Sequence, residues 1–132
     1  MRYFKFDRLV RDEIVYQILK NGDLPNYRYL DDDEYVRRLK EKLLEESQEV
    51  CVAEKKEDLL EELADVLEVV ESMLEVMGSS KLDLRKVQAK KRKINGSFKK
   101  RIVVEYVRCE EKSKWLNYYL ENKQKYPEIS VK

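Results

Sequence analysis

Two long amphipathic segments separated by a short polar turn constrain the fold more than any other feature of this sequence. Apolar side chains recur at helical spacing over residues 34–54 and again over residues 58–77, on either side of the stretch "KKED". The 132 residues include only 3 Gly and 2 Pro, and 42% of them are charged, a composition typical of long helices rather than short strands. The sequence therefore predicts an antiparallel helical hairpin.

The rest of the chain predicts shorter elements around this hairpin. Further helices are expected over residues 9–20, 82–93 and 111–125. Glycine is expected to end two of the helices, the first at Asn21-Gly22 and the second long helix at Gly78. Alternating apolar residues near the N-terminus ("RYFKF") and at residues 102–108 predict two minor short β-strands. We expect an all-α fold in a single domain, residues 1–132, with residues 110–132 forming a C-terminal helical extension.

Acidic residues accompany the apolar stripe of each long helix, in the motifs "LEESQEV" and "LEELADV". The four acids of interest are Glu46, Glu49, Glu62 and Asp65. The apolar stripe of the second helix includes Leu63 and Leu67. At about 100° of rotation per residue, the four acids fall on the flank of the stripe of their own helix. Positions equidistant from the turn lie level in a hairpin, so Glu46 is expected near Asp65, and Glu49 near Glu62. Glu45 points further out and is expected to assist them.

Four converging carboxylates repel one another, and neither motif contains a basic residue to offset them. A hard divalent cation resolves this conflict because it binds several carboxylate oxygens at once. The chain has no histidine, which excludes Ser-His-Asp and Cys-His catalysis and every zinc site built on histidine. Any metal here must be held by oxygen atoms, which favours Mg²⁺, Mn²⁺ or Ca²⁺, and we expect one or two Mg²⁺ ions to fit the four acids.

Charge is segregated along the chain although the net charge is only +1. Residues 31–68 contain 15 acidic and 6 basic residues, whereas residues 81–101 contain 10 basic residues and 1 acidic residue. The basic segment, together with "RLVRDE" near the N-terminus, supplies donors for phosphate oxygens. The candidate substrate-binding residues are Arg8, Arg11, Lys91, Arg92, Lys93 and Arg101.

These motifs together resemble the all-α nucleoside triphosphate pyrophosphohydrolases, the group that includes MazG-like and phosphoribosyl-ATP pyrophosphohydrolase-like enzymes. Their E-E-x-x-E and E-x-x-D signature corresponds to residues 45–49 and 62–65, and "LVRDEI" and "KRKINGSFKKRIVV" are similar to flanking segments of one subgroup. The likeness extends over residues 3–107.

The resemblance implies Mg²⁺-dependent cleavage between the α and β phosphates of a nucleoside triphosphate, giving a nucleoside monophosphate and pyrophosphate, as in house-cleaning nucleotide pyrophosphatases. It implies that Glu46, Glu49, Glu62 and Asp65 hold the metal and that Glu45 is a further ligand or a base that orients water. It also implies a homodimer or homotetramer. The base and the sugar of the substrate stay open.

Two other functions compete with this one. A helical module that binds nucleic acid or a protein through the basic segment would show a steep salt dependence and would not need the four acids. A purely structural hairpin would explain the leucine stripes but not the placement of the acids. No apolar run approaches the roughly 20 residues that span a membrane, and the charged N-terminus has no apolar signal region, so we expect a cytoplasmic protein with free thiols at Cys51 and Cys109.

Overall fold

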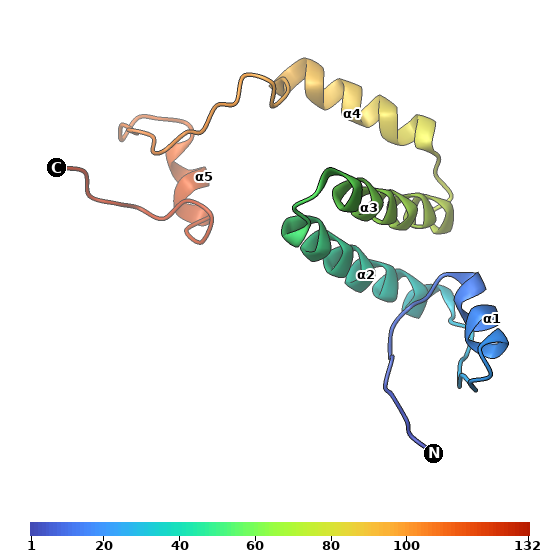
Figure 1. Cartoon of the computed structure of the whole chain (residues 1–132). Helices are drawn as coiled ribbons and strands as arrows, with labels where there is room; N and C mark the ends of the chain where they lie inside the picture. Colours follow the sequence, from blue (N-terminus) through green and yellow to red (C-terminus); the bar gives the residue numbers. More distant parts are fainter. The chain divides into compact units, whose positions relative to one another are not determined.

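The computed structural model describes all of residues 1–132 and contains five helices and no β-strand (Figure 1). The helices are α1 (Asp12–Lys20), α2 (Asp32–Val52), α3 (Lys56–Val76), α4 (Lys81–Asn95) and α5 (Leu116–Glu121). The predicted all-α class is therefore confirmed. None of the five combines the length and the apolar character that a membrane-spanning segment requires.

Internal contacts divide the chain into two compact units, residues 1–94 and residues 95–132. The first unit contains the hairpin of α2 and α3, which pack against each other along their length. The second contains α5 and the turns around it.

Helix α2 begins where the sequence offers a cap for its free N–H groups. Asp31 has an extended backbone, and its Oδ1 atom accepts a hydrogen bond of 2.8 Å from the N–H of Glu34. The first turn of the helix is acidic throughout, which complements the positive end of the helix dipole. The helix therefore begins at Asp32, slightly earlier than the helical pattern that the sequence shows from residue 34.

Glycine ends the helices at the two places where the sequence predicted it. Gly78 follows α3 with φ of 71°, and the next N–H, from Ser79, donates to the carbonyl of Leu74 at 2.9 Å. This closing pattern needs a left-handed residue, which glycine supplies without steric cost. Gly22 ends α1 in the same way with φ of 90°. The hydroxyl of Ser80 then caps α4 by accepting from the N–H of Asp83.

The hairpin core is small and contains a valine face of α3 rather than a leucine face. Leu39 of α2 and Val69 of α3 are the only buried hydrophobic side chains, 2% and 6% exposed. The predicted stripe of α3 is wrong at Leu63 and Leu67, which are 47% and 55% exposed. Both leucines lie more than about 110° from Val69 around the helix. Because α3 is apolar on two sides, its periodicity alone does not decide which side meets α2.

The two predicted strands do not form. The N-terminal segment and residues 102–108 have no regular secondary structure, and no backbone hydrogen bond joins them. Alternating apolar residues make a strand only where a second strand accepts and donates the ladder hydrogen bonds. The last helix is also shorter than expected, because the residues on either side of α5 form turns.

Candidate metal centre

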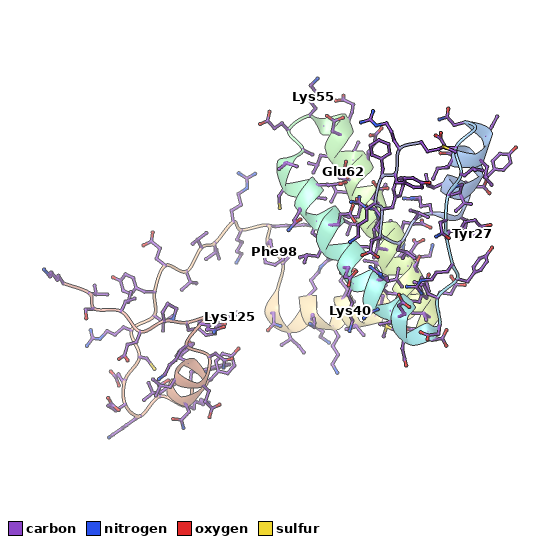
Figure 2. The ribbon with its side chains drawn as sticks, turned by 90° about the horizontal axis from the view of Figure 1, so that it is seen from below. Tyr27, Lys40, Lys55, Glu62, Phe98 and Lys125 are labelled. Atoms are coloured by element: carbon purple, nitrogen blue, oxygen red, sulfur yellow. The ribbon has the colours of Figure 1, made fainter.

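The four predicted acids meet between α2 and α3, where Glu46 is buried, Glu62 and Asp65 are half-buried and Glu49 is exposed. One carboxylate oxygen from each of Glu46, Glu49, Glu62 and Asp65 lies within 4.8 Å of the corresponding oxygen of the other three. Lys55 marks the hairpin turn in Figure 2, and Glu62 lies on α3 beyond it. The antiparallel arrangement of α2 and α3 therefore brings together residues that are 13 to 19 positions apart, as the level-position argument predicted.

The acids lie nearer the middle of the packed faces than the sequence predicted. Around α2, Glu46 lies about 20° from the direction of Leu39, and around α3, Glu62 lies about 20° from Val69. Glu46 is accordingly buried, with only 6% of its surface exposed. On α3 the observed position differs from the flank prediction because that prediction was referred to the leucine stripe, which α3 leaves exposed at Leu63 and Leu67. Glu46 is consequently shielded from water, whereas Glu49 stays exposed.

Two buried oxygens of this cluster, Oε2 of Glu46 and Oε2 of Glu62, accept no hydrogen bond from another protein group. A buried carboxylate oxygen without a donor costs free energy, of the order of 1–3 kcal/mol or more for a charged group. Native proteins tolerate such groups rarely, and mostly where a functional demand exists. The two oxygens belong to facing helices and to the same cluster, so a cation between the helices would satisfy both.

Proximity of the acids alters their protonation. Burial, followed by the negative charge of Glu49, raises the pKa of Glu46, although Lys42 opposes this change. Hydrogen bonding with Glu62 raises the pKa of Glu49. The rise in the pKa of Glu46 has the direction expected for a buried carboxylate beside a like charge, and the rise in the pKa of Glu49 has the direction expected for a carboxylate beside another carboxylate. Glu46 and Glu49 therefore retain protons more strongly than isolated glutamates do.

Two arginines of the N-terminal segment contact the acids from outside the hairpin. Nη2 of Arg11 lies 2.6 Å from Oδ1 of Asp65, and Nη1 of Arg8 lies 2.8 Å from Oε1 of Glu45. Both arginine side chains stay more than half exposed. The cluster thus has basic partners from outside its own motifs, which the sequence motifs alone did not indicate.

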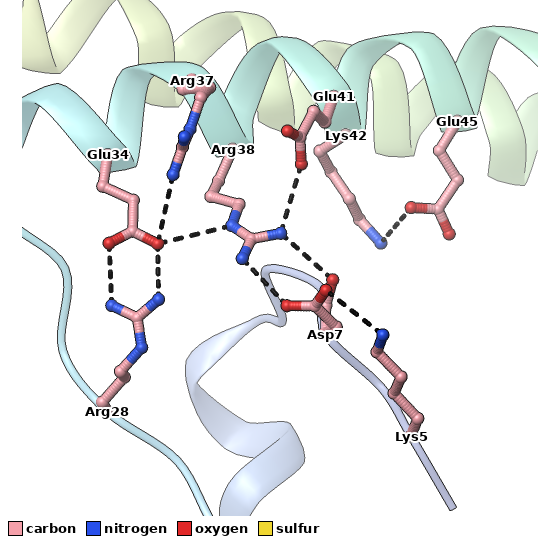
Figure 3. Close-up of polar contacts among 9 residues, drawn as sticks. All are labelled: Lys5, Asp7, Arg28, Glu34, Arg37, Arg38, Glu41, Lys42 and Glu45. Carbon is pink, nitrogen blue, oxygen red and sulfur yellow. Dashed lines mark hydrogen bonds and ion pairs between the residues drawn. The ribbon is translucent and has the colours of Figure 1, made fainter.

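A network of ion pairs attaches the N-terminal segment to α2 (Figure 3). Arg38 is its centre, because its guanidinium contacts Asp7 at 2.9 Å, Glu41 at 3.4 Å and Glu34 at 3.6 Å. Glu34 also receives two hydrogen bonds from Arg28, which lower the pKa of Glu34 to about 2. This network holds the loop before α1 against the helix and so positions Arg8 and its neighbours over the acids.

Lys42 is a site residue that the sequence analysis did not select. Its Nζ atom lies 3.4 Å from Oε2 of Glu45 and 3.3 Å from Oε1 of Glu46. A lysine three and four positions before a pair of glutamates is a pattern that could have identified it. Lys42, Arg8 and Glu45 also line a recess of about 170 Å³ between the N-terminal segment and α2. The recess has both basic and acidic walls.

The remaining predicted substrate-binding residues lie elsewhere. Lys91, Arg92 and Lys93 are exposed on α4 and form no ion pair with the four acids. Arg101 belongs to the unit of residues 95–132 and has a left-handed backbone, with φ of 58°. Their role toward a substrate stays a prediction.

Comparisons of the chain with protein-family models, with curated proteins and with solved structures find no match. The chemistry of the site is therefore argued from its own residues.

Proposed function

We propose that this protein is a Mg²⁺-dependent nucleoside triphosphate pyrophosphohydrolase of the MazG-like type, which cleaves between the α and β phosphates and releases pyrophosphate. The observation that supports this most is the convergence of four carboxylates around two buried oxygens that lack donors, on Glu46 and Glu62. Their order, E-E-x-x-E on one helix and E-x-x-D on the next, is the signature that the sequence resembles.

The donor set fits a hard cation. All four groups are carboxylates, no sulfur or imidazole is present, and the oxygens lie close enough together to share an ion. Glu46, Glu49, Glu62 and Asp65 would hold Mg²⁺ or Mn²⁺. When bound, such a cation neutralises phosphate charge and makes a coordinated water more acidic.

The other charged groups then have separate tasks. Glu45 lies next to the cluster but is not part of it, which suits a carboxylate that orients a water molecule or accepts its proton. Arg8 and Arg11 present guanidinium groups that match the oxygens of a triphosphate. Bound cation and substrate would compete with their present acidic partners, so both arginines would turn toward the phosphates. Lys42 remains beside Glu45 and Glu46 and limits their repulsion.

Self-association belongs to the same proposal, as a homodimer or homotetramer. The α3 side chains of Leu60, Leu63 and Leu67 form an exposed apolar row at helical spacing. The hairpin alone buries only two hydrophobic side chains, which is little for a helical domain. A second copy packed on this row would enlarge the core.

A panel of nucleoside triphosphates tests the proposed reaction. The purified chain is incubated with each nucleotide and millimolar Mg²⁺, and pyrophosphate is measured separately from orthophosphate. Pyrophosphate and nucleoside monophosphate in equal amounts, abolished by EDTA, would support the proposal. Orthophosphate as the first product, or no product from any common or modified nucleotide, would contradict it. The panel also ranks the bases and sugars.

A further inference from the structure

Four aromatic residues gather around α5 in the unit of residues 95–132. The ring of Tyr118 lies 5.8 Å from that of Trp115 and 5.7 Å from that of Tyr126, and the rings of Tyr119 and Tyr126 are 5.3 Å apart. Trp115 meets Tyr118 edge-on, at 82°. The contact with Tyr118 orients the indole, and 58% of Trp115 remains exposed. A fixed, exposed aromatic ring presents a flat surface for stacking.

Two tight turns fix the backbone of the residues that precede this cluster in the sequence. The N–H of Ser113 donates to the carbonyl of Glu110 at 2.9 Å, and the N–H of Leu116 donates to the carbonyl of Ser113 at 3.2 Å. The hydroxyl of Ser113 also accepts from the N–H of Trp115 at 3.2 Å. The position of the indole relative to residues 107–113 is thus set by backbone geometry within one unit.

An open hollow of about 610 Å³ lies between this turn segment and the aromatic residues. Trp115 and Tyr119 line it, together with Arg108, Lys112 and Glu110. Arg108 and Lys112 form no ion pair with any acidic residue. The volume falls within the range of about 300–1,000 Å³ that small-molecule sites have in proteins.

The charge of the unit indicates an anionic ligand. Residues 95–132 contain nine Lys and Arg and five Asp and Glu, a net charge of +4. Glu110 is the only acid that lines the hollow, against two basic side chains. A flat aromatic surface beside two free cations matches a ligand that has a planar ring and a phosphate.

We propose that this hollow is a nucleotide-binding site, in which a base stacks on Trp115 and a phosphate contacts Arg108 and Lys112. The ligand is recognised as a base with its phosphate, which either a free nucleotide or a nucleotide within a single strand supplies. The site is separate from the four acids of the hairpin and needs no metal.

Trp115 is the single tryptophan of the chain, so its fluorescence reports on this site alone. The full-length protein in EDTA is titrated with a nucleoside triphosphate and, separately, with a short single-stranded oligonucleotide. Stacking on the indole is expected to quench its emission with saturation. Excitation at the red edge of the indole band, and a parallel titration of free N-acetyltryptophanamide, correct for light absorbed by the nucleotide.

Matched variants identify the partners of the phosphate. Arg108→Gln and Lys112→Gln are expected to weaken binding by at least about threefold each, and more at low salt, because each removes a charge contact. Lys123→Gln, a lysine of the same unit that does not line the hollow, is the control and should leave affinity unchanged. Trp115→Ala, followed by calorimetry, is expected to weaken binding by at least about tenfold. A circular dichroism spectrum shows whether each variant keeps its helices.

The outcomes distinguish a free nucleotide from a single strand as the ligand. They also distinguish ligand binding by the aromatic residues from contact between copies of the chain. Saturable quenching by the free nucleotide assigns the site to a small ligand, and quenching by the oligonucleotide alone assigns it to a single strand. Absence of saturable quenching in both titrations would overturn the proposal. A change in emission that follows protein concentration rather than ligand would also overturn it, because the aromatic residues would then lie between copies of the chain. Activity plays no part in these measurements, so failure here leaves the proposed hydrolysis to its own test.

Discussion

Arg11 forms an ion pair of 2.6 Å with Asp65 across 54 positions of the sequence, and so occupies one side of the acidic cluster. Both groups are partly exposed, so this pair contributes little stability, within about 1 kcal/mol. Its importance lies in competition, because a cation and Arg11 require the same carboxylate.

Arg11→Gln is expected to raise the affinity for the cation and to lower the catalytic efficiency. Mg²⁺ should bind up to about fivefold more tightly, because the guanidinium no longer competes for Asp65. The value of kcat/KM should fall by at least about tenfold, because the triphosphate loses a charged donor. Calorimetric Mg²⁺ titration and pyrophosphate release measure the two effects. Arg37→Gln, at an exposed arginine that pairs with Glu34, is the control. Equal Mg²⁺ affinity in both variants would show that Arg11 does not compete.

Glu49→Gln and Glu62→Gln should each lower turnover by at least about 100-fold, through loss of a cation ligand from a facing helix. Glutamine keeps the shape of the side chain and removes its charge. Turnover is measured as pyrophosphate release at saturating Mg²⁺. Glu61→Gln changes an exposed neighbour on α3 and should have little effect. Near-normal turnover in both folded cluster variants would remove these residues from the site.

A charge in the exposed leucine row should dissociate the proposed oligomer. Leu63→Glu places a carboxylate at a position that is exposed in a single chain, so the hairpin itself should stay folded. Light scattering after size exclusion is expected to show a smaller mass than for the parent. Leu84→Glu, at an exposed residue of α4, tests whether any added charge has this effect. A monomeric parent would contradict the proposed assembly.

The sequence predicted those features that depend on local signals or on simple geometry. The hairpin follows from two helical periods and a polar turn, and Gly22 and Gly78 mark helix ends because a left-handed residue is needed there. The meeting of Glu46 and Asp65 follows from their equal distances to the turn. None of these inferences requires knowledge of which faces pack.

Features decided by long-range packing could not be predicted in the same way. Helix α3 has two apolar sides, and either could face α2. The structure buries the side with Val69 and leaves Leu63 exposed. The contacts of Arg8 and Arg11 join positions 37 and 54 residues apart, and no periodic pattern indicates such pairs. The two expected strands do not form for a related reason. Alternating apolar residues within a segment do not show whether a second strand lies beside it to complete the hydrogen bonds.

The last prediction concerns Glu46, whose charge the fold buries beside other acids. The pKa of Glu46 is raised above its ordinary value of 4.5, so the folded state binds more protons than the unfolded state. Stability of the metal-free protein must then fall as pH rises from about 4.5 through the raised value. Glu46→Gln removes this pH-dependent loss of stability, because glutamine does not ionise. In EDTA the variant should melt above the parent at about pH 7, and the difference should shrink near about pH 4, where the parent's glutamate is protonated in both states.

Mg²⁺ should reverse the order in which the parent and Glu46→Gln melt. At neutral pH and 100 times its Kd, the cation would stabilise the parent by about 2.7 kcal/mol, several degrees in Tm for a domain of this size. The variant lacks a ligand and gains less, so the parent should then melt at the higher temperature. Glu61→Gln should follow the parent in both buffers. A buried glutamate with a purely structural role predicts that the variant melts lower in EDTA as well as in Mg²⁺, and such parallel loss would exclude Glu46 from the cation site.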